Sequence, residues 1–178
     1  MAGSGADERA WVRGAQQGDV SAMEALFREH WPRAYRAAYL VVHDAAGAED
    51  IAQEAFLAAV RNLDRFDGRR PFAPWLHRIV VNRAIDWARA RSLRRETGDA
   101  ALAGVSAPER GAAGGATALA ATLQRLSPEH RAVIVLRHLL EYTPGEIAKL
   151  LDLPRGTVNS RLRRGLDELG RLAGEEIR

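Results

Sequence analysis

Residues 143–172 read TPGEIAKLLDLPRGTVNSRLRRGLDELGRL, and this stretch decides the fold of the C-terminal part of the chain. Apolar residues recur three and four apart on both sides of a break at residues 152–155, which predicts two amphipathic helices. Asp152 tolerates the left-handed conformation at a helix end, and Pro154 blocks continuation of the first helix. The predicted buried residues are Ile147, Leu150 and Leu151 in the first helix and Val158, Leu162, Leu166 and Leu169 in the second. Because so short a turn forces a steep crossing, the pattern predicts a helix-turn-helix.

The second of these helices carries polar side chains off its apolar stripe. They are Asn159, Ser160, Arg163 and Arg164. In a helix-turn-helix the first turns of the second helix enter the major groove, where Asn pairs with adenine and Arg pairs with guanine. The pattern therefore favours DNA binding over the alternative of a helical hairpin with a solvated arginine face.

A second motif occupies residues 64–95 and reads DRFDGRRPFAPWLHRIVVNRAIDWARARSLRR, which predicts a loop followed by one long helix. Polar residues lie off the apolar stripe of this helix: Arg78, Asn82, Arg83, Asp86, Arg89 and Arg91. Aromatic residues alternate with arginines in the loop and the first helical turn: Phe66, Arg69, Arg70, Phe72 and Trp75. A ring can stack on an unstacked base while a guanidinium holds the phosphate, so single-stranded nucleic acid is one candidate ligand. Large aromatics at a helix start are also common core anchors, and spacing alone leaves both interpretations open.

The helix predicted within residues 48–66 exposes an acidic face formed by Glu49, Asp50, Gln53 and Glu54. This face either contacts a basic partner or is solvated. Upstream of it we expect helices near residues 7–17, 20–30 and 32–43, with Asp19 as an N-cap and Pro32 in the first turn of the third. In the C-terminal part, Ser127 and Thr143 each precede a proline and are predicted to cap helices.

Charge is segregated along the 178-residue chain, although the formal net charge is only +3. Residues 1–60 hold five Arg and nine acids, which gives −4, whereas residues 61–95 hold ten Arg and three acids, which gives +7. Residues 154–171 hold five Arg and two acids, which gives +3. Basic segments favour a polyanionic partner through counterion release. GC-rich coding would also enrich arginine, which supplies 25 of the 26 basic residues.

A stretch rich in small residues divides the chain in two. Of the 19 residues at 98–116, 12 are Gly or Ala, and no apolar period survives there. Such a segment is typical of a flexible linker with an r.m.s. span of about 25 Å. The predicted fold class is therefore all-α, with two small helical domains at residues 6–97 and 117–178 joined by the linker at 98–116. The C-terminal domain is the helix-turn-helix domain.

Several function classes are disfavoured by residues that the chain lacks. Without cysteine there is no disulfide scaffold, thiol nucleophile or Cys-ligated metal site. The five histidines show no metal-ligand spacing, and neither a Gly-rich phosphate loop nor a nucleophile elbow occurs. We therefore expect no enzyme, no catalytic residue, no metal and no cofactor. No apolar run approaches the roughly 18 residues of a membrane span, and the first residues do not form a signal peptide, so we expect a soluble cytoplasmic protein without membrane insertion.

Three segments taken in order carry a resemblance to a known family. They are AEDIAQEAFLAAVRNLDRFDG at 48–68, PFAPWLHRIVVNRAIDWARAR at 71–91 and LSPEHRAVIVLRHLLEYTPGEIAKLLDLPRGTVNSRLRRGLDEL at 126–169. Together they closely resemble the extracytoplasmic-function (ECF) sigma factors of bacterial RNA polymerase, and the resemblance covers about residues 16–172. It implies a protein that binds core RNA polymerase and directs promoter-specific transcription initiation by recognising −10 and −35 elements. Residues 6–97 would be region 2, and residues 117–178 would be region 4.

The resemblance also implies a role for each candidate residue. Contacts with the clamp helices of the largest polymerase subunit would come from Glu49, Asp50, Gln53 and Glu54. Capture and contact of the −10 element would come from Phe66, Arg69, Arg70, Phe72, Trp75, Asn82, Arg83 and Asp86. The −35 element would be read by Asn159, Ser160, Arg163 and Arg164, with Arg155 and Thr157 on phosphates. The linker would thread toward the RNA exit channel, and an anti-sigma factor is an expected partner.

The chain departs from the family pattern at a few positions. Many sigma factors of this kind have an acid at the position of Gly47, and an aromatic and an acid at those of Pro144 and Gly145. The residues at positions 159 and 163 vary, so no promoter sequence is implied. The alternative is a conventional helix-turn-helix regulator with an N-terminal sensing or dimerisation domain. A dimeric regulator needs a rigid half-site spacing, so the flexible linker favours the sigma factor.

Overall fold

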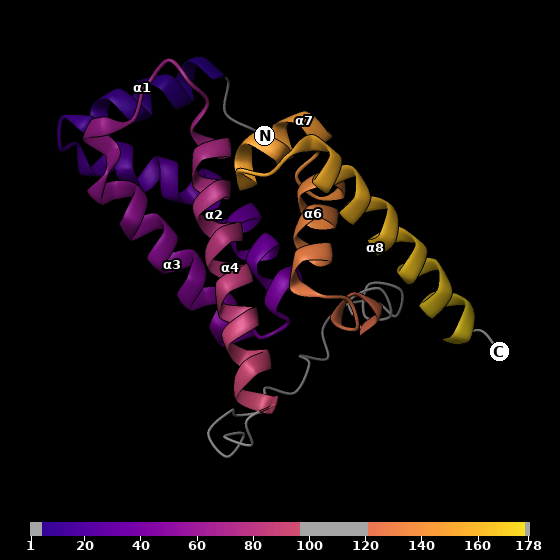
Figure 1. Ribbon diagram of the computed structural model, residues 1–178. Helices are drawn as coiled ribbons and strands as arrows, with labels where there is room; N and C mark the ends of the chain where they lie inside the picture. Colours follow the sequence, from indigo (N-terminus) through magenta and orange to yellow (C-terminus); the bar gives the residue numbers. More distant parts are fainter. Residues whose placement is uncertain (1–4, 97–120, 177–178) are drawn as a thin grey trace.

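Helices form the secondary structure of the described parts of the chain, as the apolar periodicity predicted. The computed structural model describes residues 5–96 and 121–176. The N-terminal part contains α1 (Gly5–Gln16), α2 (Val20–Val42), α3 (Ala45–Arg61), the short 3-10 helix η1 (Leu63–Arg65) and α4 (Phe72–Glu96). The C-terminal part contains α6 (Pro128–His138), α7 (Pro144–Leu151) and α8 (Arg155–Glu176) (Figure 1). The all-α class is confirmed, and the predicted linker at 98–116 lies outside the described residues.

Two helix starts follow their sequence signals closely. At the start of α2, the Asp19 carboxylate accepts a hydrogen bond from the Ser21 N–H at 2.8 Å. At the start of α6, the Ser127 hydroxyl accepts one from the His130 N–H at 3.3 Å. Each side chain satisfies one of the N–H groups that a helix leaves unpaired in its first turn.

The helix-turn-helix break also forms as predicted. Thr143 and Glu146 make a capping box, in which the Thr143 N–H donates to the Glu146 carboxylate at 2.8 Å and Thr143 Oγ1 accepts from the Glu146 N–H at 3.3 Å. Asp152 ends α7 in the left-handed conformation with φ 53°. Because α8 begins three residues later, the chain turns sharply between the two helices.

The structure corrects the prediction of separate helices at 20–30 and 32–43, because α2 runs unbroken through Pro32. A proline inside a helix removes one backbone hydrogen bond and costs about 3 kcal/mol. Burial outweighs this cost, since residues four and three apart are buried on both sides of the proline: Ala22, Leu26, His30, Ala34, Ala37, Ala38 and Val41. The stripe packs on α1, α3 and α4, so tertiary packing sets the length of α2.

The buried stripe of α8 also differs from the prediction. Val158 and Leu162 are buried as expected, but Leu166 is 45% exposed. Gly165 takes the core-facing position, where an added Cβ would lie 2.9 Å from Ile134 Cδ1 on α6. Leu172 completes the stripe at 1% exposure. The close approach of α6 to α8 at the glycine turns the helix so that Leu166 faces outward.

The two parts of the chain pack against each other. Helix α6 lies on α2 and α4, and α7 lies on α4, as Figure 1 shows. The buried residues of both parts join in one hydrophobic cluster. The Arg89 Nε on α4 also lies 2.6 Å from a Glu129 carboxylate oxygen on α6. The helix-turn-helix is therefore held against the long helix of the N-terminal part.

Gly47, in the first turn of α3, allows α3 and α4 to approach closely. It is buried, its N–H donates to Asp44 Oδ1 at 2.8 Å, and an added Cβ would lie 2.7 Å from the Trp87 ring. An acidic side chain at this position would collide with that ring, so packing explains the glycine here.

We predict that Gly47→Ala and Gly170→Ala change stability in opposite directions. Gly170 is exposed within α8, and an added Cβ meets nothing within 4 Å, so the alanine should stabilise the helix by about 0.5–1 kcal/mol. At Gly47 the same gain is outweighed by overpacking against Trp87, which leaves a net loss of about 1–2 kcal/mol. Urea denaturation of both variants measures the free energy of unfolding. Equal stabilisation by both substitutions would show that the Trp87 ring moves aside to accommodate the added methyl group.

Candidate nucleic-acid interface

The loop between η1 and α4 is held at both ends by side chains from α1. Gln16 Nε2 donates to the backbone oxygens of Leu63 at 3.0 Å and Phe66 at 2.9 Å. The Glu8 carboxylate accepts from the N–H of Phe72, the first residue of α4, at 2.8 Å. These contacts fix where the chain leaves η1 and where α4 begins. They therefore set the position of the aromatic residues in between.

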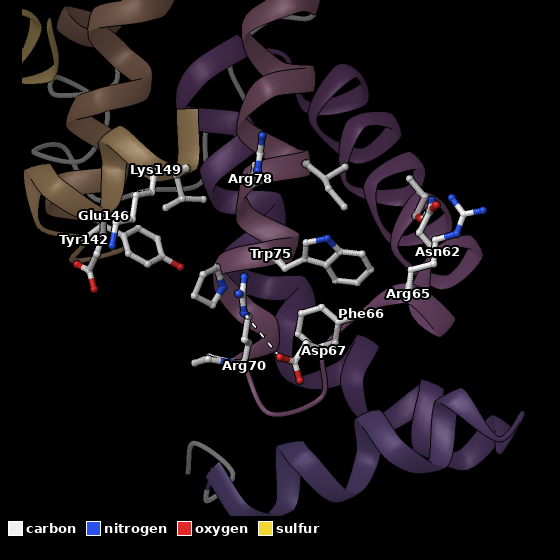
Figure 2. Close-up of a pocket in the computed structure, with 15 residues that line it drawn as sticks. Asn62, Arg65, Phe66, Asp67, Arg70, Trp75, Arg78, Tyr142, Glu146 and Lys149 are labelled. Atoms are coloured by element: carbon white, nitrogen blue, oxygen red, sulfur yellow. Dashed lines mark hydrogen bonds and ion pairs between the residues drawn. The ribbon is translucent and has the colours of Figure 1, made fainter. Parts of the chain in front are cut away.

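Phe66 and Trp75 stack at the centre of a cavity of about 820 Å³ between this loop, α3, α4 and α7 (Figure 2). Their ring centroids are 4.7 Å apart, with an interplanar angle of 24°, and both rings are half-buried. Stacked rings that remain partly exposed present a π-face at which a base can stack. Two of the three aromatic candidates, Phe66 and Trp75, therefore lie at a hollow in the surface.

Phe72 lies in the core and not in this cavity. It is 2% exposed and meets the Phe66 and Trp75 rings edge to face at 5.9 and 5.7 Å. A base cannot stack on Phe72 in this arrangement. Of the three predicted aromatics, Phe72 is the anchor that supports the other two.

Arginines border the cavity on its open side. Arg65, Arg70 and Arg78 line it and are exposed. Asp67 also lines it and accepts from the Arg69 Nε at 3.0 Å, and these hydrogen bonds lower the pKa of Asp67 below its usual value. The predicted residue Arg69 is exposed and pairs with Asp67, but it lines a separate hollow beside α1 and not this cavity.

One wall of the cavity comes from the helix-turn-helix. Tyr142, Glu146 and Lys149 line it from the α7 side, opposite Asn62 and Arg65, as Figure 2 shows. The Tyr142 hydroxyl and His77 Nδ1 form a hydrogen bond at 2.8 Å. Burial, with smaller effects of His30 and Arg33, lowers the pKa of His77 to about 4, so its ring is neutral at physiological pH. This contact ties α7 to α4 beside the stacked rings.

The polar face of α4 lies against the turn of the helix-turn-helix. Asn82 and Asp86 line a smaller cavity of about 260 Å³ together with Leu151, Leu153 and Arg161. Separately, the third predicted residue of this face, Arg83, is half-exposed and pairs with Glu54 of α3 at 2.5 Å. The −10 candidates on α4 are thus partly covered by the C-terminal part.

The −35 candidates gather on the first turns of α8. Four of them are exposed: Arg155, Asn159, Arg163 and Arg164. Thr157 and Ser160 are half-buried, and Ser160 Oγ donates to the Thr157 carbonyl oxygen at 2.9 Å. Since Val158 and Leu162 fix the opposite side of the helix in the core, the exposed side chains point outward.

The acidic candidates form an exposed face of α3. Glu49, Asp50, Gln53 and Glu54 are all exposed, while Ile51, Ala52, Ala55 and Phe56 between and beside them are buried. Gln53 Nε2 donates to Glu49 at 3.4 Å along the helix. The structure therefore separates this face cleanly from the core.

Residues 5–96 and 121–176 contain neither a metal-ligand cluster nor a candidate membrane span. No group of three or more His, Cys, Asp or Glu side chains is arranged to hold a metal ion there. In the same ranges, no helix combines the length and the apolar character that crossing a membrane requires.

Sequence reasoning missed several residues of the interface. Glu8 and Gln16 act on a loop 50 to 64 positions further along the chain, and no local pattern signals such contacts. Asn62 directly follows α3 and Arg65 ends η1, so their position in the sequence just before the loop was the available signal. Tyr142 and Lys149 join the cavity only through the packing of the two parts.

Family comparisons match both parts of the chain. Residues 26–94 match Sigma-70 region 2, and residues 116–169 match Sigma-70 region 4. The ECF RNA polymerase sigma factor SigW of Bacillus subtilis is 32% identical over 175 residues, which cover 89% of this chain and 92% of SigW. SigM of Mycobacterium tuberculosis, also an ECF RNA polymerase sigma factor, is 34% identical and matches over 88% of this chain and 80% of SigM.

Solved structures show the same fold. CnrH, in its complex with the cytosolic domain of CnrY, superposes with a TM-score of 0.70 at 28% identity, over 95% of this chain and 98% of CnrH. The sigma factor RpoE of Bartonella quintana, in complex with the anti-sigma factor NepR, gives a TM-score of 0.68 at 22% identity, over 87% of this chain and 98% of RpoE. With both sigma regions matched in order over nearly the full length of its relatives, the chain belongs to the ECF sigma factors, non-enzymatic proteins that direct RNA polymerase to promoters.

Proposed function

We propose that the chain divides promoter recognition among three surfaces, with residues 6–97 acting as region 2 and residues 117–178 as region 4, joined by the linker at 98–116. The acidic face of α3 binds core polymerase, the Phe66–Trp75 cavity captures a −10 base, and the start of α8 reads the −35 element. The observation that carries this proposal is the half-buried Phe66–Trp75 stack inside an arginine-bordered cavity. A conventional regulator binds only duplex DNA, in which the bases stay stacked, so such a cavity would receive no base.

The cavity suits an unstacked base for reasons of both shape and charge. Its volume of about 820 Å³ exceeds that of a nucleotide, and its centre is aromatic. Stacking of a base on an aromatic ring is worth about 1–3 kcal/mol, and the bordering Arg70 and Arg78 can hold the adjoining phosphates. Phe72 supports this site from the core without touching the base.

The −10 candidates on α4 become fully accessible to DNA when the two parts of the chain separate. Tyr142, Glu146 and Lys149 form a wall of the cavity, and Asn82 and Asp86 face the turn after α7. The contacts that hold them include the His77–Tyr142 hydrogen bond and the Arg89–Glu129 ion pair, each of modest strength. We infer that binding to the polymerase moves region 4 away from α4 and opens the cavity.

The start of α8 combines two kinds of contact. Asn159 and Arg163 lie four residues apart on one line of the helix, and both are exposed. Asn pairs with adenine and Arg with guanine in the major groove, so these two residues are assigned to base reading. Arg155 and Thr157 begin the helix, where N–H groups and positive charge favour phosphate. Ser160 and Arg164 flank this line.

The remaining partners follow from the family. The complex of RpoE with an anti-sigma factor supports an inhibitory partner for this chain as well. Action on RNA polymerase supports a cytoplasmic location. The linker is assigned to the path toward the RNA exit channel.

We predict that Trp75→Leu impairs open-complex formation about tenfold or more while closed-complex binding stays within about twofold. Leucine keeps apolar volume but removes the π-face on which the flipped base stacks. Permanganate footprinting of the holoenzyme on promoter DNA measures opening, and a mobility shift at low temperature measures closed-complex binding. Trp11→Leu is the matched control, because Trp11 is half-buried on α1 and does not line the cavity. Equal loss in both steps would assign Trp75 a purely structural role.

We predict that Asn159→Ala and Arg163→Ala relax the preference at single −35 positions, whereas Arg155→Ala weakens binding to all sequences alike. A base-edge contact is worth about 1–3 kcal/mol of discrimination, and a phosphate contact changes the salt slope by about one. Selection from a randomised −35 library at two salt concentrations separates the two effects. If the Asn159 and Arg163 variants keep the parental preference and change only the salt slope, α8 holds the backbone without reading bases there.

We predict that the double charge reversal Asp50→Lys with Glu54→Lys abolishes co-purification with core polymerase while the helical fold is retained. Both side chains are exposed, so the change removes attraction to a basic partner without disturbing the core. It also breaks the exposed Glu54–Arg83 ion pair, which contributes at most about 1 kcal/mol to stability. The control pair Glu24→Lys with Asp167→Lys changes the net charge equally at exposed positions away from α3. Circular dichroism checks the fold of each variant. Wild-type binding by the Asp50/Glu54 variant would remove α3 from the polymerase interface.

A further inference from the structure

We propose that the junction of α2, α4 and α6 is a binding site for a phosphate-bearing anion, either free phosphate or a small phosphomonoester. A cavity of about 330 Å³ lies there, lined by the end of α2, the C-terminal half of α4 and the start of α6. It is separate from the Phe66–Trp75 cavity and from the first turns of α8, and neither promoter reading nor polymerase binding uses it.

The strongest sign of a ligand is Arg131, in the second turn of α6. The residue is only 8% exposed, and its Nε is buried without a hydrogen-bond partner. Burial lowers the pKa of Arg131 to about 10, so the side chain stays charged at neutral pH. The acid whose charge acts on Arg131, Glu129, is engaged by Arg89 at 2.6 Å. A buried charge without a hydrogen-bonded counter-ion is destabilising, and an anion in the adjoining cavity offsets that cost.

His43, which also lines the cavity, is the second sign of a ligand. It ends α2 in the left-handed conformation, with φ 53°, and its Nε2 is buried without a partner. Burial and the charge of Arg131 together lower the pKa of His43 to about 4. The Leu40 backbone hydrogen-bonds to the ring, so the neutral ring keeps its proton on the other nitrogen and Nε2 presents a lone pair to the cavity. The P–OH group of a phosphate monoanion can donate to this Nε2 while its other oxygens accept from Arg131.

The rest of the lining has the composition of an anion site. Arg91 and Arg125 line the cavity, Ser92 and Ser127 contribute hydroxyls, and no carboxylate is among the described residues that line it. Arg91 pairs with Asp44 at 2.7 Å and lies over the Trp87 ring at 5.0 Å. The N-terminus of α6, an 11-residue helix, borders the cavity at Ser127, so the positive end of the helix dipole adds to the potential there.

The position of the site gives the ligand a structural consequence. His43 and Arg91 belong to the N-terminal part, whereas Ser127 and Arg131 belong to the C-terminal part. An anion bound by both parts stabilises their packed arrangement, in which α7 forms a wall of the Phe66–Trp75 cavity. Phosphate-bearing molecules would therefore favour the closed form of the protein.

The test measures thermal stability and calorimetric binding of the full chain with three probes at matched ionic strength: inorganic phosphate, glycerol 3-phosphate and glycerol. Chloride serves as the reference anion. We expect phosphate or glycerol 3-phosphate to bind at a single site. Whichever probe binds more tightly shows whether the site takes free phosphate or a phosphomonoester. Glycerol should not bind. Equal binding of glycerol and glycerol 3-phosphate would overturn the proposal.

Arg131→Met and Arg36→Met form a matched pair of variants. Both lose one positive charge, but Arg36 is exposed and does not line the cavity. Without phosphate, Arg131→Met should fold at least as stably as the wild type, because methionine replaces a buried charge that lacks a partner. With phosphate, Arg131→Met should bind at least tenfold more weakly, whereas Arg36→Met should bind as the wild type does.

The Arg131→Met and Arg36→Met variants also distinguish binding at the site from general stabilisation. Phosphate gives the latter to any protein because it is excluded from protein surfaces. An equal phosphate response in the wild type and both variants would show general exclusion only and would overturn the proposal. A marked loss of stability of Arg131→Met in chloride would also overturn it, because that loss would show that Arg131 already has a stabilising partner within the protein.

Discussion

The candidate nucleic-acid interface depends on two side chains of α1 that reach across the N-terminal part. Gln16 holds the backbone where η1 ends, and Glu8 caps the first residue of α4. The loop between them contains Gly68 and Pro71 and has no helical hydrogen bonds of its own, so these contacts decide where it lies. Loops that carry function need such a scaffold, because the mobile chain would otherwise lose entropy on each binding event. Phe66 and Trp75 are presented at a fixed place for this reason.

The aromatic cluster shows how one short segment serves both packing and binding. Phe72 is buried and meets its neighbours edge to face, while Phe66 and Trp75 remain half-buried and stacked. Pre-organised rings lose little conformational freedom when a base stacks on them, which leaves more of the stacking energy for binding. Of the two interpretations that the sequence left open, Phe72 fits the core anchor, and base stacking remains our proposal for Phe66 and Trp75.

Capping residues and apolar spacing, which are local in the sequence, predicted most of the helices. Long-range packing determined the features that these local patterns did not predict. The caps at Asp19, Ser127 and Thr143 need only a few neighbouring residues, and all three form as expected. Pro32 suggested a helix start, but the buried stripe on both sides of it keeps α2 continuous. Apolar spacing placed Leu166 in the core, whereas the contact of Gly165 with Ile134 turns it outward. The exposed candidates on α3 and α8 were predictable because exposure there follows from helical periodicity alone.

The junction between the two parts is built differently from the cores that it joins. The interior of the N-terminal part is largely aliphatic, whereas the junction contains the neutral His77 hydrogen-bonded to Tyr142 and the partnerless nitrogens of His43 and Arg131. Polar groups that are incompletely paired lower the free energy gained on burial. Interfaces of this kind resemble those between transiently associating proteins. A sigma factor must place two DNA-reading surfaces on separate promoter elements, so the separation that we propose would break these polar contacts together with the apolar contacts that join both parts in one cluster.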